Sequence, residues 1–143
     1  MTARPAEVRA QAAGSLARQI VLWAPPVLYA AAIFLFSAMP RPPRVPGGLS
    51  DKWSHGLAYA GLTVLLIRAL AGGAWRGVTA RVCVAAAVIA ALYGVTDELH
   101  QLFVPGRQAD VLDVAADSIG ATIAAVLAGG WRLVARRRTD ARI

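Results

Sequence analysis

Cysteine is almost absent from this sequence: Cys83 is the only one in 143 residues, and it lies within an apolar run. A single cysteine excludes an intrachain disulfide and a thiolate cage for a metal ion, so we expect Cys83 to be an inert packing residue. Acidic residues are also scarce, at 8 against 15 Lys and Arg, which leaves a formal net charge of +7. The basic residues lie between apolar segments and at the tail. They form no face interleaved with aromatic residues, which argues against nucleic-acid binding.

Long apolar runs make up most of the chain. Hydrophobic residues account for 57% of it and the mean hydropathy is +0.54, which is more than a soluble domain of this size can bury. Crossing a hydrocarbon core of about 30 Å takes roughly 20 helical residues. The sequence therefore predicts four membrane-crossing helices, at about 20–39, 54–70, 82–100 and 111–134.

These segments predict an all-α membrane protein, a four-helix transmembrane bundle over residues 20–134 with tails at 1–19 and 135–143. Pro25 and Pro26 should kink or delay the first helix. The Arg-bearing leader before that helix also fits a signal peptide. However, the apolar run is long for one and lacks a good small-residue cleavage site, so a membrane span is the preferred interpretation.

The distribution of positive charge predicts the orientation. With the N-terminus inside, eleven of the fifteen Lys and Arg residues fall on the cytoplasmic side and four on the other side. The positive-inside rule therefore favours both termini in the cytoplasm, with the basic tail near anionic lipid. It follows that both histidines, and every acidic residue outside the two tails, lie near one outer membrane boundary.

The polar stretch between the third and fourth segments is the default functional site. An Asp at the centre of a membrane helix costs roughly 2.5 to 3.5 kcal/mol on insertion scales, so such residues are rarely kept without a role. The sequence Val104-Pro105-Gly106-Arg107 predicts a tight turn. Arg107 can project from that turn toward carboxylates or toward a phosphate. The stretch holds these polar residues: Asp97, Glu98, His100, Gln101 and Arg107.

Helical spacing groups these residues with polar residues of two other segments. If the second helix begins near Ser50, three side chains share one stripe at i, i+4 and i+8: Asp51, His55 and Tyr59. In the third segment, i+3 and i+4 spacing joins Asp97, His100 and Gln101. The fourth segment carries a stripe of Asp110, Asp113 and Asp117. Such a stripe in lipid needs cationic partners, and the nearby candidates are Lys52, Arg107 and the two histidines.

Each signal also has a structural interpretation. Asp51 and Lys52 could serve only in capping and interfacial solvation. His55 and Tyr59 could be satisfied interface residues. Asp110 fits the N-cap of the fourth helix. A buried ion pair between Asp113 and Arg107 could be purely structural, so the sequence leaves both interpretations of that pair open.

Taken together, the residues resemble the VanZ-like family of small bacterial membrane proteins over about Phe34 to Val126. The first span ends in Phe36-Ser37-x-x-Pro40, as in that family. The rest of the match is carried by Asp51-Lys52-x-x-His55-x-x-x-Tyr59, Tyr93-Gly94-x-x-Asp97-Glu98-x-His100-Gln101-x-Phe103-x-Pro105-Gly106-Arg107 and Asp113-x-x-x-Asp117-x-x-Gly120. The chain departs from the family pattern at three positions. The family more often has Asn where Asp117 stands, a bulky residue at Gly56 and a small polar residue at Asp110.

The resemblance implies a multi-pass protein of the bacterial cytoplasmic membrane, in a family named for low-level resistance to the glycopeptide teicoplanin. Two hypotheses follow. The site could act on or bind an envelope lipid, a lipid-linked cell-wall precursor or a glycopeptide, with Asp97, Glu98, His100 and His55 as catalytic candidates. Its ligand-binding candidates are Asp51, Lys52, Tyr59, Gln101, Arg107, Asp113 and Asp117.

In the second hypothesis the polar cluster is a structural ion-pair network in a non-catalytic binding or scaffold protein. The residues do not decide whether the protein is an enzyme. Histidines and carboxylates together could hold a divalent cation, Mg²⁺ or Mn²⁺ through oxygen and Zn²⁺ through imidazole. Small residues from Ala121 to Gly130 would permit close helix packing and oligomerisation.

Overall fold

The computed structural model describes residues 5–40 and 51–140. The described residues form four α-helices and one short 3₁₀ helix, without a strand. The elements are α1 (Pro5–Ser37), α2 (Asp51–Leu70), η1 (Trp75–Gly77), α3 (Ala80–Gln101) and α4 (Val111–Asp140). The four predicted helices are thus confirmed as helices. The proposed Ser50 cap of α2 lies outside the described residues.

Three of these helices are long and apolar enough to cross a membrane. They are the windows Gly14–Ser37, Ala80–Gln101 and Val111–Ala135. Many large apolar side chains on the helix surfaces are exposed, as expected for a surface that contacts lipid. α2 is not apolar enough to be grouped with these three helices, because polar residues such as Lys52 and His55 interrupt its first half.

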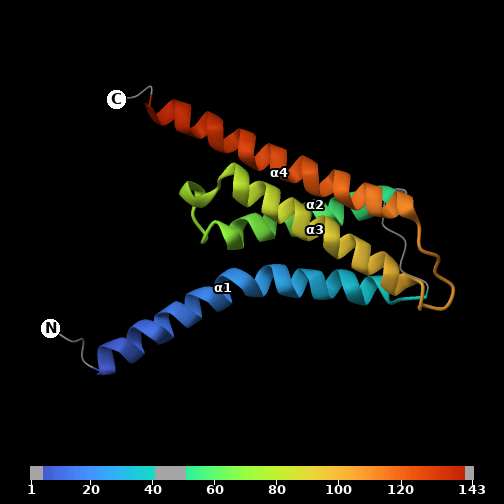
Figure 1. The fold of residues 1–143 in the computed structure, drawn as a ribbon, viewed down its shortest axis with the longest axis horizontal. Helices are drawn as coiled ribbons and strands as arrows, with labels where there is room; N and C mark the ends of the chain where they lie inside the picture. The colour runs from blue at the N-terminus through green and yellow to red at the C-terminus, as the bar shows by residue number, and fades with distance from the viewer. Residues whose placement is uncertain (1–4, 41–50, 141–143) are drawn as a thin grey trace.

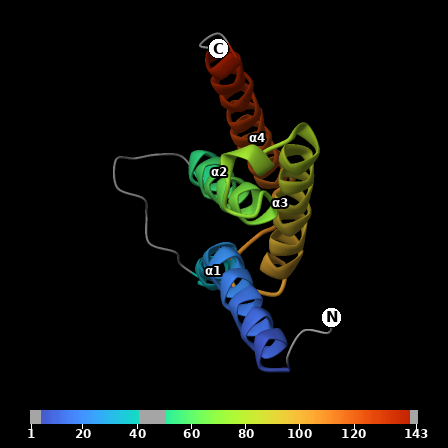
Figure 2. The same cartoon turned by 90° about the vertical axis from the view of Figure 1, so that its left-hand side faces the viewer.

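α2, α3 and α4 pack together, and α1 lies apart from α4 and leans mainly on α2 (Figures 1 and 2). α2 contributes the largest buried side chains of the core, including Tyr59 and Leu62. α3 and α4 contribute small ones, among them Cys83, Ala86 and Ala121. Cys83 is buried in this core, which agrees with the packing role expected for it. α2 packs against the other three helices, so part of its surface faces protein and can be less apolar than a surface that faces lipid, which accounts for the polar sequence of α2.

The closest helix crossing is that of α2 with α4. A Cβ atom added to Gly120 would clash with the carbonyl group of Gly56 and lie 2.8 Å from its Cα. A Cβ on Gly56 would in turn lie 3.3 Å from the carbonyl oxygen of Ala116. Because only glycine allows such backbone approach, this crossing holds the polar first turns of α2 and α4 side by side.

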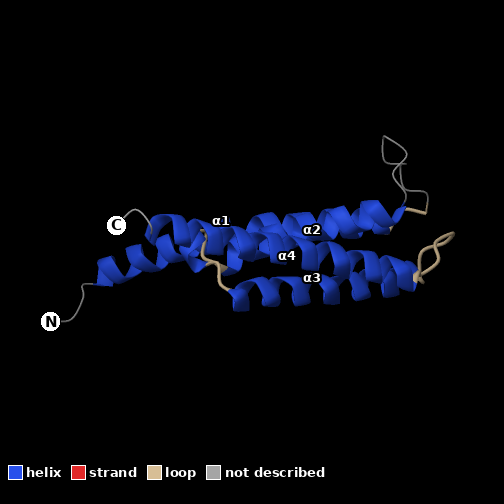
Figure 3. Ribbon diagram, turned by 90° about the horizontal axis from the view of Figure 1, so that it is seen from above, coloured by secondary structure: helices blue, strands red, loops and turns tan. Residues whose placement is uncertain are grey.

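The molecule has two distinct ends. α1 begins and α4 ends at the same end, on the left of Figure 1, and all four helices run roughly along the long axis (Figures 1 and 3). At that end Arg18 donates to the carbonyl oxygen of Gly72 at 3.0 Å. The opposite end carries the loop from α3 to α4, where Arg107 N donates to Val104 O at 3.1 Å and Gly106 has a φ of +83°. The tight turn predicted there is therefore confirmed.

The two prolines of the first helix, Pro25 and Pro26, lie inside α1. Its helix runs continuously through Pro25 and Pro26 and bends along its length in Figure 1. It begins at Pro5, well before the predicted start near residue 20, and α4 continues to Asp140, beyond the predicted end at 134. The predicted tail regions are thus partly helical.

Candidate functional site

The site lies at the loop end, where the first turns of α2 and α4 meet the last turns of α3. Lys52 Nζ donates hydrogen bonds to Asp110 Oδ2 at 2.6 Å and to Asp113 Oδ1 at 2.8 Å. The bond from Lys52 lowers the pKa of the Asp110 carboxyl, so this residue is ionised at neutral pH. Asp110 Oδ1 also accepts from Leu112 N at 2.8 Å, which confirms Asp110 as the N-cap of α4. Asp110 therefore links Lys52 to the start of α4.

His55 lies one turn further along α2, between two carboxylates of α4. Its Nδ1 is 3.1 Å from Asp117 Oδ1, and its Nε2 is 3.9 Å from Asp113 Oδ2. Asp117 is fully buried, with an exposed fraction of 0%. A Cβ on Gly94 would lie 2.8 Å from Asp117 Oδ2, so the glycine leaves room for this carboxylate against α3. The predicted α2 and α4 stripes therefore face each other.

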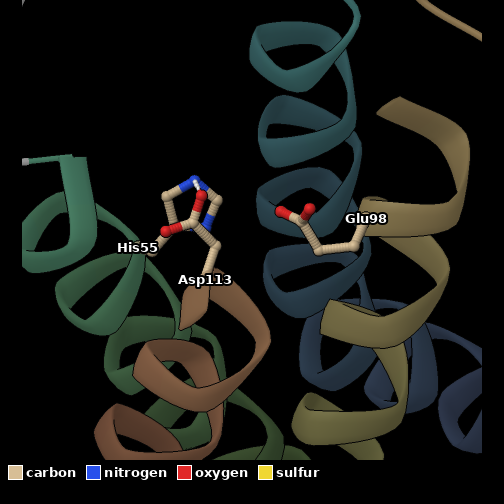
Figure 4. A group of neighbouring side chains, drawn as sticks. All are labelled: His55, Glu98 and Asp113. Atoms are coloured by element: carbon tan, nitrogen blue, oxygen red, sulfur yellow. Dashed lines mark ion pairs between the residues drawn. The ribbon is translucent and has the colours of Figure 1, made fainter. Parts of the chain in front are cut away.

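Glu98 completes this group from α3. Figure 4 shows its carboxylate pointing across the gap between helices toward His55 and Asp113. One oxygen, Oε2, accepts from Asp110 N at 2.8 Å. The other, Oε1, is buried and has no hydrogen-bond partner in residues 5–40 and 51–140, the part that the structure describes. Ligand atoms of His55, Glu98 and Asp113 all lie within 4.8 Å of one another.

A second chain of contacts runs along the loop side of α3. Gln101 Nε2 donates to Asp97 Oδ2 at 3.4 Å, which agrees with the shared helix face predicted from their i+4 spacing. Arg107 donates to Gln101 Oε1 from Nε at 3.1 Å and from Nη2 at 2.7 Å. The suggested pair of Arg107 with Asp113 is therefore wrong. Lys52 takes the place of that arginine because it lies in the first turn of α2, directly against the first turn of α4.

His100 does not join the cluster. Its ring stacks on Phe34 of α1, with ring centroids 4.3 Å apart and an interplanar angle of 29°. The sequence grouped it with Asp97 and Gln101, but those two pair with each other. Tyr59 lies deeper in the core, with its hydroxyl buried and unpartnered. The side chain of Asp51, at the first residue of α2, lies outside the part that the structure describes.

The described residues give the site a formal negative charge. Their cationic side chains are Lys52 and Arg107, and their carboxylates are Asp97, Glu98, Asp110, Asp113 and Asp117. Buried carboxylates are stable only when they are paired, hydrogen-bonded, protonated or bound to a cation. Within the described part of the chain, these buried carboxylate oxygens have no hydrogen-bond partner: Asp97 Oδ1, Glu98 Oε1 and Asp117 Oδ2. An imidazole oriented by a carboxylate beside such oxygens can take up a proton or help to bind a cation.

An apolar groove between α2 and α4 begins beside this cluster. Its cavity volume is about 360 Å³, and Lys52 lines one part of it. Small residues form its floor, including Gly56, Ala60 and Ala116. Large apolar side chains, Leu57 and Ile119 among them, complete the walls and are exposed. Sequence reasoning missed this groove, although the small residues at i and i+4 on each helix were a signal for it.

The fold and the site define a small all-helical membrane protein with a buried, mainly acidic polar cluster at one end of the bundle. The sequence model of the VanZ/LLP1 family matches residues 18–133. The chain therefore belongs to the VanZ/LLP1 family, as the sequence resemblance indicated. No curated protein and no solved structure matches the chain.

Proposed function

We propose that this protein binds a lipid-linked component of the bacterial cell envelope and thereby lowers susceptibility to teicoplanin-type glycopeptides. The lipid chain lies in the α2–α4 groove, and its phosphate meets Lys52. The observation that carries this proposal is the adjacency of an apolar groove, open to lipid, and a cationic side chain at its polar end. Lipid-linked envelope precursors combine these two chemical parts.

Lys52 is suited to the phosphate contact. Its side chain is 42% exposed, and two of its three N–H donors go to Asp110 and Asp113. The third donor remains for a phosphate oxygen. The neighbouring carboxylates would repel a bare phosphate, so they favour a ligand whose affinity comes mainly from its chain. This geometry favours binding over the purely structural network, which would need no groove.

Native mass spectrometry of the purified protein tests the proposal with a polyprenyl phosphate, the matching polyprenol and phosphatidylglycerol. We expect retention in the order polyprenyl phosphate, polyprenol, phosphatidylglycerol. Ala60→Phe fills the groove and should weaken polyprenyl phosphate binding about tenfold or more, or ~1.4 kcal/mol. Ala85→Phe places the same side chain on an exposed face of α3 and should have no effect. Lys52→Met should weaken binding of the phosphate but not of the polyprenol.

The same variants connect binding to the phenotype. In cells with equal membrane levels of each protein, the teicoplanin concentration that inhibits growth should fall with Ala60→Phe and stay unchanged with Ala85→Phe. Equal retention of all three lipids would mean that the groove binds membrane lipids without selectivity, which would contradict the proposal. If the Ala60→Phe cells kept the same teicoplanin tolerance, the groove would have no part in that tolerance. The polar cluster would then be better explained as a structural ion-pair network.

The proposed orientation in the cytoplasmic membrane has both termini inside and the polar site outside. The charge asymmetry supports it, as does the location of the α1 start and the α4 end at one end of the molecule (Figure 1). We expect a membrane-impermeant maleimide to label Gln108→Cys in intact cells and Ala74→Cys only after lysis. Both positions are exposed in opposite loops, while Cys83 is buried. The reverse labelling pattern would mean that the protein has the opposite orientation in the membrane.

A further inference from the structure

We propose that His55, Glu98 and Asp113 bind one divalent transition-metal ion. The three side chains come from three different helices, α2, α3 and α4, and their ligand atoms lie within 4.8 Å of one another. Two ligand atoms at about 2.1 Å from one ion can be at most about 4.2 Å apart. A bound ion would therefore draw these atoms about half an ångström closer together. Figure 4 shows Glu98 directed toward the other two residues.

The orientation of His55 is the one found in metal sites. Histidines that bind a metal usually donate their other ring N–H to a carboxylate, which fixes the tautomer and the direction of the ring. Asp117 Oδ1 lies 3.1 Å from His55 Nδ1 and takes this role. The ring then directs Nε2 toward Asp113 Oδ2, 3.9 Å away. That separation exceeds a hydrogen bond and suits two ligands of one ion.

Glu98 supplies an independent observation. It is 4% exposed, and its Oε1 has no hydrogen-bond partner among the residues that the structure describes, although Oε2 accepts from the backbone N–H of Asp110. A buried carboxylate oxygen without a donor carries a large desolvation cost. This oxygen belongs to the side chain that points at His55 and Asp113. A cation between the three side chains would satisfy it.

Charge and ligand type decide the class of ion. Among the described residues, the site has five carboxylates and two permanently cationic side chains, so a divalent ion would offset most of the excess negative charge of this part of the chain. One imidazole and two carboxylates form a set typical of Mn²⁺, Fe²⁺ and Zn²⁺, whereas Mg²⁺ and Ca²⁺ prefer oxygen ligands alone. We therefore assign the site to a transition metal, with open positions for water or a ligand oxygen.

The test uses the full-length protein, purified in detergent, stripped with a chelator and titrated with Mn²⁺ under electron paramagnetic resonance. We expect one bound Mn²⁺ per chain, competed by Zn²⁺ and not by equimolar Mg²⁺. Pulsed measurements on the wild type should show a ¹⁴N coupling from one histidine. This readout needs no variant, so it stands even where a substitution impairs folding. The absence of stoichiometric binding or of the nitrogen coupling would overturn the proposal.

Two adjacent residues of α3 give a matched comparison. Glu98→Gln removes a ligand and should lower Mn²⁺ affinity at least about tenfold, or ~1.4 kcal/mol. Asp97→Asn removes an equally buried carboxylate that contacts Gln101 and supplies no ligand atom, so affinity should fall clearly less than in Glu98→Gln. Equal losses in both variants would indicate only a diffuse electrostatic attraction. Because no lipid is added, failure of the lipid proposal leaves this result unaffected.

Discussion

Gly120→Ala is expected to destabilise the protein more than any other alanine substitution of a glycine in α4. The added methyl group would clash with the backbone of Gly56, which cannot move as a flexible side chain can. Inserting a methyl group into a well-packed site typically costs about 1 to 3 kcal/mol, and a backbone contact falls at the upper end of that range. We expect a lower thermal unfolding temperature in detergent and a lower membrane level.

Gly130→Ala is the control for this substitution. It lies on the same helix, and nothing is within 4 Å of a Cβ at that position. Alanine also favours the helix over glycine by roughly 1 kcal/mol in soluble hosts, so the control should be neutral or stabilising. If the two variants unfolded at the same temperature, the close α2–α4 crossing would be contradicted. The expected separation of α2 from α4 should also move His55 away from Asp113 and so weaken the proposed metal binding.

The same crossing shows what the sequence could predict about packing. Small residues were correctly expected to permit close helix approach, but the range Ala121–Gly130 was only partly the right place. The closest contact is at Gly120, and Gly129 makes only an ordinary contact with Cys83. Helix rotation decides which small residue meets its neighbour, and rotation depends on all the packed side chains together. The amino-acid composition of a helix therefore does not predict how the helix is rotated about its axis.

Helix positions were predictable because apolar length signals a membrane span. Helix ends were not, since α1 begins at Pro5 in a stretch rich in Ala, Arg and Gln. These residues have high helix propensity and continue the helix beyond the apolar run. The search for spans by hydropathy cannot detect such extensions. In α2 hydropathy is misleading in the other direction. Its polar site residues lower the mean hydropathy of the helix, and contacts with the other helices cover these residues.

The sequence predicted which helix faces carry the site residues, but it did not predict which side chains contact one another. Spacing placed His55 and the α4 aspartates on faces that do meet in the structure. It grouped His100 with Asp97 and Gln101, and it could not show that Glu98, two residues from His100 on α3, is the one that reaches the α2 and α4 side chains. Glu98 turns to the cluster with α2 and α4, while His100 turns to Phe34 of α1. That difference follows from the position of α1 beside α3, which no local pattern encodes.

The second large effect is expected at Asp117, as a positioning residue for the metal site. Asp117→Ala removes the acceptor that orients the His55 ring and leaves a small void against Gly94. Loss of such an orienting partner typically lowers metal affinity about 10- to 100-fold. We expect a loss of that size in the Mn²⁺ titration. Thermal unfolding of the metal-free protein should also shift downward, because the His55 contact is lost.

Asp117→Asn separates positioning from charge. The amide oxygen of asparagine can still accept from His55 Nδ1, so the ring keeps its direction while one negative charge disappears. We therefore expect Asp117→Asn to regain most of the Mn²⁺ affinity that Asp117→Ala loses, together with the ¹⁴N coupling. An asparagine variant as weak as the alanine variant would mean that Asp117 acts through its charge, with His55 held by other contacts.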